Sequence, residues 1–186
     1  WKNRQVERLA AAARGETPVE LEHYEQVNAR VFEEWRERPW QAVIDGTVLL
    51  HHSPHGHPDP MRGRYAFVAD SAGLEREGLE RLRAVLIARG SAPARIVNAP
   101  DRASRILAIA ASALMGVPRV DWTPAEAGSA LVIAWSLETV ENVDFLKAMH
   151  DHRPGQHLFA HASSWVDPFP YAPDVTTFLH QTVTCP

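Results

Sequence analysis

The stretch Ala130-Leu131-Val132-Ile133-Ala134-Trp135 decides the fold class of this chain. An uninterrupted apolar run with β-branched residues at its centre is typical of a strand buried on both faces, as the strands of a parallel sheet are. A helical pattern follows, carrying Val143 and Met149 and ending at Pro154, and a second apolar strand is expected over His157–Ala162. Strand, helix and strand in this order predict a parallel arrangement with a helical crossover.

The same alternation occurs nearer the N-terminus. A short apolar strand is expected over Tyr65–Ala69, followed by a helix rich in leucine and by a second strand over Arg95–Val97. Asp101 is a suitable N-cap for the next helix, which is expected to run to Met115 before Gly116 ends it. These elements extend the parallel sheet predicted for the C-terminal half.

The first part of the chain has a different character. Thr17-Pro18-Val19-Glu20 has the pattern of a capping box, and it predicts a helix that ends at Pro39. Ala42–Ile44 and Thr47–Leu50 then flank Asp45-Gly46, a dipeptide suited to a type I′ turn, so a β-hairpin is expected here.

The predicted fold is therefore α/β: a three-layer sandwich with a mainly parallel sheet, preceded by a helical N-terminal segment and a β-hairpin. Residues 1–63 are expected to form an appendage that ends in a loop rich in histidine and proline, and residues 64–186 a Rossmann-like α/β domain. Two stretches are ambiguous. Val117–Trp122 lies too close to Ala130 for a helical crossover, so it either pairs antiparallel with its successor or is no strand. Asp174–Thr184 has an N-cap residue, but its threonines and valines favour a strand.

The composition limits the kinds of partner and the cellular compartment that are expected for this chain. Of the 186 residues, 45% are hydrophobic and 23% are charged, as in ordinary globular domains. A net charge of −4 argues against nucleic acid as a partner, and no apolar run approaches the roughly 18 residues of a membrane span. The single cysteine, Cys185, fits a reducing, cytoplasmic compartment. Because the chain begins with Trp1 and not with methionine, it is expected to be a fragment of a longer protein or a processed product.

Polar residues follow each predicted strand, at the edge where open parallel sheets bind ligands. They are Asp70, Ser71, Asn98, Asp101, Ser136, Glu138, His161, Ser163 and Ser164. Histidine suits general acid–base chemistry near neutral pH, so an enzyme would use His161 with Asp70 or Ser136 assisting. Helix capping is the favoured explanation of Ser71, Asp101 and Ser136, and a structural histidine hydrogen-bonded within a loop is favoured over a catalytic one at His161.

Several familiar catalytic and cofactor patterns are absent from the sequence. There is no G-x-G-x-x-G turn after a strand and no G-x-x-x-x-G-K-[ST], so neither a dinucleotide nor a P-loop nucleotide site is expected. There is also no G-x-S-x-G turn for a serine nucleophile. A His161–Cys185 dyad would be possible in principle, although the glycine usual after such a histidine is Ala162 here. No organic cofactor is predicted.

Four histidines and an aspartate crowd the segment His51–Asp59, in which His55, His57 and Asp59 could bind zinc or another transition metal. His55-x-His57-x-Asp59 resembles the H-x-H-x-D start of metallo-β-lactamase-type hydrolases over these five residues, and Pro60 stands where that family has histidine. A solvated loop stiffened by prolines is the alternative interpretation.

The loop that contains Trp165, Phe169 and Tyr171 could cover a ligand, dock a partner or fill the end of the core. Lacking a complete catalytic motif, the sequence predicts a non-catalytic domain that binds a small-molecule ligand or a protein partner, within a larger protein or complex. A small hydrolase or transferase with its site around His161 is the alternative. The residues expected to contact a ligand are Ser71, Asn98, Asp101, Ser163 and Trp165.

Overall fold

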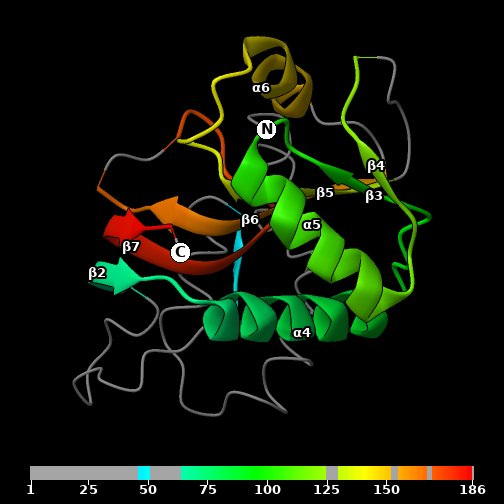
Figure 1. Cartoon of the computed structure of the whole chain (residues 1–186), viewed down its shortest axis with the longest axis horizontal. Coiled ribbons are helices and arrows are strands. Elements are labelled where there is room, and N and C mark those ends of the chain that lie inside the picture. The colour runs from blue at the N-terminus through cyan, green and yellow to red at the C-terminus, as the bar shows by residue number, and fades with distance from the viewer. Residues whose placement is uncertain (1–45, 51–63, 125–129, 152–154, 167–168, 186) are drawn as a thin grey trace, which may run out of the picture.

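The structure is a computed structural model that describes residues 46–50, 64–124, 130–151, 155–166 and 169–185 (Figure 1). Its strands are β1 (Val48–Leu49), β2 (Arg64–Ala69), β3 (Ile96–Asn98), β4 (Arg119–Asp121), β5 (Ala130–Ser136), β6 (Gln156–Ser164) and β7 (Val175–Thr184). Its helices are α4 (Ala72–Ala88), α5 (Arg102–Met115) and α6 (Val143–His150). The seven strands form one sheet, and every pairing between described strands is parallel.

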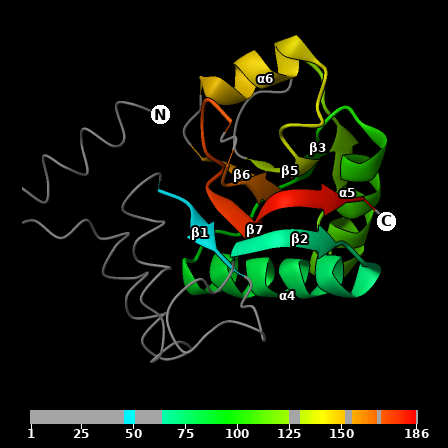
Figure 2. The same ribbon diagram turned by 90° about the vertical axis from the view of Figure 1, so that its left-hand side faces the viewer.

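Helices cover both faces of the sheet, with α4 and α6 on opposite sides (Figure 2). On one face, leucines of α4 and α5 pack against strand residues such as Ile96, Ile133 and Phe159. On the other face, Phe145 and Met149 of α6 pack against alternate residues of the same strands. Every residue of β5 is buried, as the apolar run predicts for a strand covered on both faces. The predicted three-layer α/β sandwich with a parallel sheet is confirmed.

Short polar residues start the three helices. The Ser71 hydroxyl accepts a hydrogen bond from the Leu74 N–H at 3.2 Å, and the Asp101 carboxylate accepts one from Ser104 at 2.8 Å. Asn142 does the same for α6. Gly116 ends α5 with a φ of 69°, in the left-handed region that favours glycine. The capping predicted for Ser71 and Asp101, and the helix end predicted at Gly116, are therefore confirmed.

The strand order is β1-β7-β6-β5-β3-β4, and β2 also pairs with β7. From β3 the chain passes through α5 to the edge strand β4, whereas from β5 it passes through β6 to β7 in the other direction. The order therefore reverses between the neighbours β3 and β5. It differs from the 3-2-1-4-5-6 order of a Rossmann domain, because β2 lies beyond β7 instead of in the middle, and the Rossmann-like prediction is not confirmed.

Both interpretations of Val117–Trp122 were wrong. Residues Arg119–Asp121 form β4, and this strand pairs parallel with β3, not antiparallel with its successor β5. A short connection suffices because β4 has only three residues, so the chain has little length to retrace before it starts β5 on the other side of β3. Asp174–Thr184, in contrast, contains the strand that its threonines and valines favour.

Part of the predicted appendage joins the sheet. Val48 and Leu49 form β1, which pairs parallel with the start of β7, while β2 pairs with the remainder of β7 on the same side. The predicted N-terminal helix, the first strand of the hairpin and the histidine-rich loop lie outside the described residues. The division of the chain at residue 63 therefore stays a prediction.

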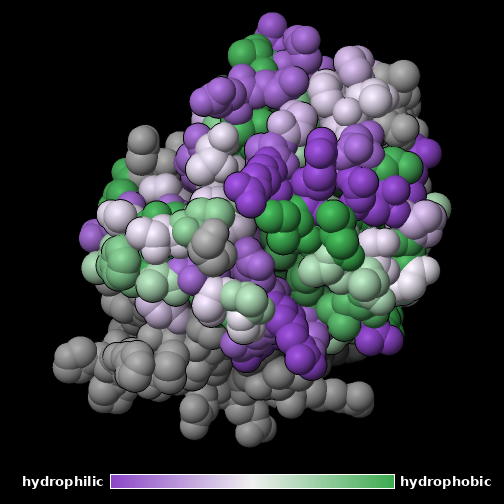
Figure 3. Space-filling model, in the orientation of Figure 1, coloured by the Kyte–Doolittle hydropathy of each residue, from purple (hydrophilic) through white to green (hydrophobic). Residues whose placement is uncertain are grey.

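The outer face of α5 is apolar. Ile106 and Ile109 are 52% and 53% exposed, and hydrophobic surface gathers over this helix in Figure 3. Exposed apolar patches often mark contacts with other proteins. A protein partner stays a prediction. The exposed face of α5 is a suitable binding surface for such a partner in the described part of the chain. None of the helices in the described part of the chain is long and apolar enough to cross a bilayer.

Candidate functional site

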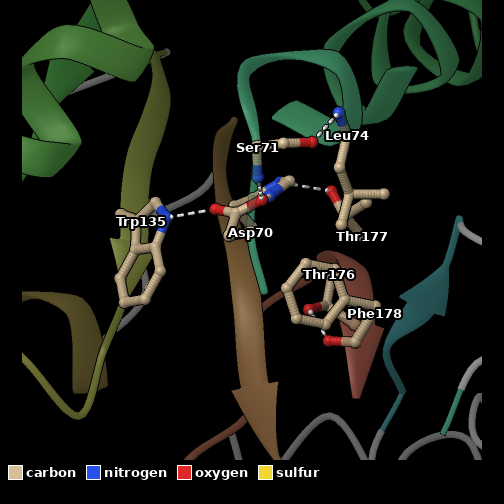
Figure 4. Close-up of polar contacts among 8 residues, drawn as sticks. Asp70, Ser71, Leu74, Trp135, Thr176, Thr177 and Phe178 are labelled. Atoms are coloured by element: carbon tan, nitrogen blue, oxygen red, sulfur yellow. Dashed lines mark hydrogen bonds and ion pairs between the residues drawn. The ribbon is translucent and has the colours of Figure 1, made fainter. Parts of the chain in front are cut away.

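A buried hydrogen-bond network links the end of β2, the strands β5 and β6 and the start of β7, and His161 of β6 is at its centre. The imidazole is fully buried. Its Nε2 lies 3.1 Å from Oδ1 of Asp70, and its Nδ1 lies 3.0 Å from the hydroxyl of Thr177. In Figure 4, Asp70 lies between Trp135 on one side and Thr177 on the other. The sequence therefore predicted two members of one network, Asp70 and His161, which lie 91 residues apart.

The carboxylate of Asp70 is held by three donors. Oδ2 accepts a hydrogen bond from the indole Nε1 of Trp135 at 2.7 Å, and Oδ1 accepts one from the backbone of Ser71 at 2.8 Å in addition to that from His161. Burial alone would raise the pKa of Asp70, but the hydrogen bonds and the charge of His161 hold it below its ordinary value of 3.8. The stability that comes from this ionised carboxylate is therefore present above pH 3.8 and is lost as the pH falls through the folded-state pKa.

The ionised Asp70 fixes one proton of His161. A carboxylate only accepts hydrogen bonds, so Nε2 of His161 must carry the proton between them. Nδ1 faces the Thr177 hydroxyl, which donates to a neutral ring and accepts from a charged one. Both ring nitrogens are thus occupied within the fold.

Gly78 of α4 lets the helix approach this network closely. A Cβ added to Gly78 would lie 2.9 Å from Cγ2 of Thr177 and 3.2 Å from Nδ1 of His161, and it would also collide with the Thr177 hydroxyl. The helix backbone therefore covers Thr177 and His161, and neither side chain is exposed to solvent. In this conformation a substrate cannot reach them.

Ser136 does not join the network, although it was predicted beside Asp70 and His161. Neighbouring residues of a strand point to opposite faces, so Trp135 faces Asp70 while Ser136 faces away. The Ser136 hydroxyl donates to Oε2 of Glu138, whose Oε1 accepts the backbone N–H of Ser164 at 3.0 Å. Glu138 thus bridges the carboxyl ends of β5 and β6.

The residues predicted to contact a ligand are distributed along the same edge, and each has a partner within the fold. Asn98 accepts a hydrogen bond from Arg119 and donates one to the carbonyl of Ala99. The Ser163 hydroxyl lies 3.0 Å from that of Thr176. The Trp165 indole donates to the Tyr65 carbonyl of β2 at 3.2 Å. Ser71 and Asp101 cap their helices, as described above.

The structure describes the cysteine of the candidate His–Cys dyad but not the candidate metal ligands. His55, His57 and Asp59 lie outside the described residues, and within the described ranges no group of histidine, cysteine, aspartate or glutamate is arranged to hold a metal ion. Cys185 is exposed, whereas His161 is engaged by Asp70 and Thr177, so the two do not form the dyad considered from the sequence.

Sequence reasoning missed three residues that build the network: Trp135, Thr177 and Gly78. Trp135 was recognised as part of a buried strand, but its indole N–H needs an acceptor when buried, and that requirement was a usable signal. Thr177 was recognised only as a strand former. Gly78 lies inside a helix, where glycine is costly, so its presence there could have indicated a close approach of two backbones.

Comparisons with known proteins assign no family. No protein-family description matches the sequence, and no curated protein matches it. Among solved structures, the crystal structure of purine phosphoribosyltransferase from Pyrococcus horikoshii Ot3 is similar, with 12% sequence identity and a TM-score of 0.49 over 64% of this chain and 92% of that chain. A likeness at this level assigns no activity, so a function for this chain rests on its own geometry.

Proposed function

We propose that the chain is a domain that binds a small polar ligand at the carboxyl edge of the sheet, between β3 and β5. The observation that carries the proposal is the reversal of strand order at this point, with α5 leaving β3 on one face and α6 leaving β5 on the other. In open parallel sheets the connections diverge at such a reversal and leave a crevice, in which ligands bind.

Side chains from both strands supply polar groups at this edge. Asn98 ends β3 and Asp101 follows it, and Ser136 ends β5 and Glu138 follows it. One oxygen of Asp101 caps α5, whereas the other, Oδ2, is buried and accepts no hydrogen bond. A buried acceptor without a donor is costly, so a ligand that displaces the atoms covering Oδ2 and brings an N–H or O–H group would bind favourably.

Three carboxylates and one arginine act on the pKa of Cys185, which directly follows β7. Burial raises the pKa of the Cys185 thiol, and the negative charges of Asp70, Glu75 and Asp101 raise it further. Arg102 opposes them only in part. Of these groups Asp101 and Arg102 lie at the β3–β5 edge with opposite charges, and Arg119 donates to Asn98 there, so a neutral hydrogen-bond donor suits this edge.

The alternative, a hydrolase or transferase around His161, has one observation in its favour. Thr177, His161 and Asp70 form a hydroxyl–imidazole–carboxylate chain, the order found in nucleophilic triads. The nitrogens are reversed, because Nδ1 faces the hydroxyl and Nε2 faces the carboxylate. Thr177 and His161 are also fully buried under α4, so the helix would have to move before any substrate could react.

Titration of the labelled protein with adenosine, glucose and the common amino acids at millimolar concentration tests the binding proposal. We expect at least one compound to shift the backbone amide signals of residues 99–104 and 137–140 in NMR spectra. Asp101→Asn keeps an oxygen to cap α5 but replaces the second oxygen with a donor. It is expected to weaken that binding at least tenfold. Asp144→Asn, at an exposed position in the first turn of α6, is the matched control.

Binding that shifts signals over α6 but not those at the β3–β5 edge would contradict the proposal. So would equal affinities of the wild type and Asp101→Asn for a compound that does bind at this edge. A panel in which no compound binds would also count against it, because the panel spans neutral, cationic and donor-rich groups.

A further inference from the structure

His180 of β7 is a second buried histidine, and the network around His161 does not use it. It is 6% exposed, and neither Nδ1 nor Nε2 makes a hydrogen bond. Buried polar groups are nearly always hydrogen-bonded, so an imidazole with two unbonded nitrogens is unusual within a sheet. The arrangement is tolerable for a neutral ring and much less so for a charged one.

The neighbours of His180 offer little to a positive charge. In the sheet it lies beside Tyr65 of β2 and Ser164 of β6, and on its own strand the Phe178 ring is 6.0 Å away, centroid to centroid. Glu138, an exposed carboxylate, contacts one of these neighbours by accepting the Ser164 N–H. The Gln181 backbone favours the charged ring, although burial has the larger effect on the pKa of His180.

We propose that protonation of His180 releases the start of β2 from β7, so that the attachment of this edge strand depends on pH. An imidazolium has two N–H donors that need acceptors or water, and among the described residues no acceptor is bonded to either nitrogen. Among the described strands, β2 pairs with β7 alone, whereas β6 is held between β5 and β7. Opening β2 is therefore the least costly way to bring water to the ring.

The sign of the effect follows from burial. Burial lowers the pKa of His180 below its ordinary value of 6.5. The released state, in which the ring meets water, regains the ordinary value and binds a proton more readily. Acidification below pH 6.5 therefore favours release, and the attached state is unaffected above that pH.

Two tryptophans report on opposite ends of β2. The Trp165 indole donates to the carbonyl of Tyr65, near the start of the strand. The Trp135 indole donates to Asp70, directly after its end. Loss of the first contact with retention of the second would distinguish local release from unfolding of the whole domain.

The test is to follow the indole N–H signals of protein labelled in tryptophan by NMR from pH 8 to pH 5, assigned with Trp→Phe variants. We expect the Trp165 signal to move toward its position in a solvated indole, with a midpoint below pH 6.5, while the Trp135 signal stays in place. His180→Gln and His180→Phe, two variants that cannot be protonated, are expected to hold the Trp165 signal down to pH 5. His150→Gln, which alters an exposed histidine, should behave as the wild type does.

Either of two results would overturn the proposal: a Trp165 signal that does not move between pH 8 and pH 5, or one that moves equally in a folded His180 variant. Simultaneous movement of the Trp135 and Trp165 signals would overturn it as well, because that result indicates loss of the whole fold. If one His180 variant does not fold, the other supplies the comparison. If neither folds, the wild-type difference between the two indoles decides.

Discussion

Replacing Asp70 with alanine is expected to lower the free energy of unfolding by about 3–5 kcal/mol, the usual cost of removing one partner from a buried charged pair. The change leaves three donors without an acceptor: the His161 ring, the Trp135 indole and the Ser71 N–H. Each buried donor left unpaired costs about 1–3 kcal/mol. Since domains are typically stable by about 5–15 kcal/mol, the variant should be close to unfolding.

Urea unfolding followed by circular dichroism measures this loss. Asp121→Ala is the matched control, because it also removes a carboxylate that pairs with basic side chains, but from an exposed position beside Arg119 and Arg105. Exposed pairs are screened by water and contribute little, so the control should lose far less stability. Equal losses for the two variants would show that the buried network around His161 does not stabilise the fold.

Replacing Gly78 with alanine is expected to destabilise the protein, although alanine is the better helix former by about 1 kcal/mol. The added methyl would meet the Thr177 side chain and lie 3.2 Å from the His161 ring, so α4 must move away from the sheet. Overpacking a tight contact costs about 1–3 kcal/mol, and more where backbone must shift, so a net loss is expected.

Gly73→Ala, in the same helix, is the control for this prediction. Its added methyl would be 3.7 Å from the Ser71 hydroxyl, an ordinary contact, so stability should be unchanged or slightly higher. Thr177→Ala removes the atoms that the new methyl would meet, so the loss from Gly78→Ala should shrink in the double variant. A Gly78→Ala protein as stable as Gly73→Ala would mean that α4 does not approach the sheet as described.

Local sequence signals predicted the elements of this fold well. The capping side chains of Ser71 and Asp101 and the left-handed Gly116 are decided by residues a few positions away, so they can be read from the sequence. The burial of β5 could likewise be predicted from the apolar residues of the strand itself. The order of the strands has no such local signal, because it depends on pairing between distant parts of the chain. The pairing of β4 and of β5 with β3 is an example.

The candidate site was predicted only in part for the same reason. Asp70 and His161 were recognised because polar residues at strand ends gather at one edge of a parallel sheet. Two features of the network depend on which side chains of each strand face α4. One is the contact between Asp70 and His161, whose strands lie on either side of β7. The other is the participation of Trp135 instead of Ser136. That orientation follows from the packing of the helix, which places Gly78 against Thr177.

Chemical modification of the histidines tests most directly whether the His161 network is a closed, structural part of the core. Diethyl pyrocarbonate reacts with accessible neutral imidazoles, and peptide mass spectrometry locates the product. At pH 7 we predict rapid modification of His150, whose side chain is 62% exposed, and protection of His161 until urea unfolds the protein. Modification of His161 in the folded protein at a rate close to that of His150 would contradict this account and favour an accessible catalytic histidine.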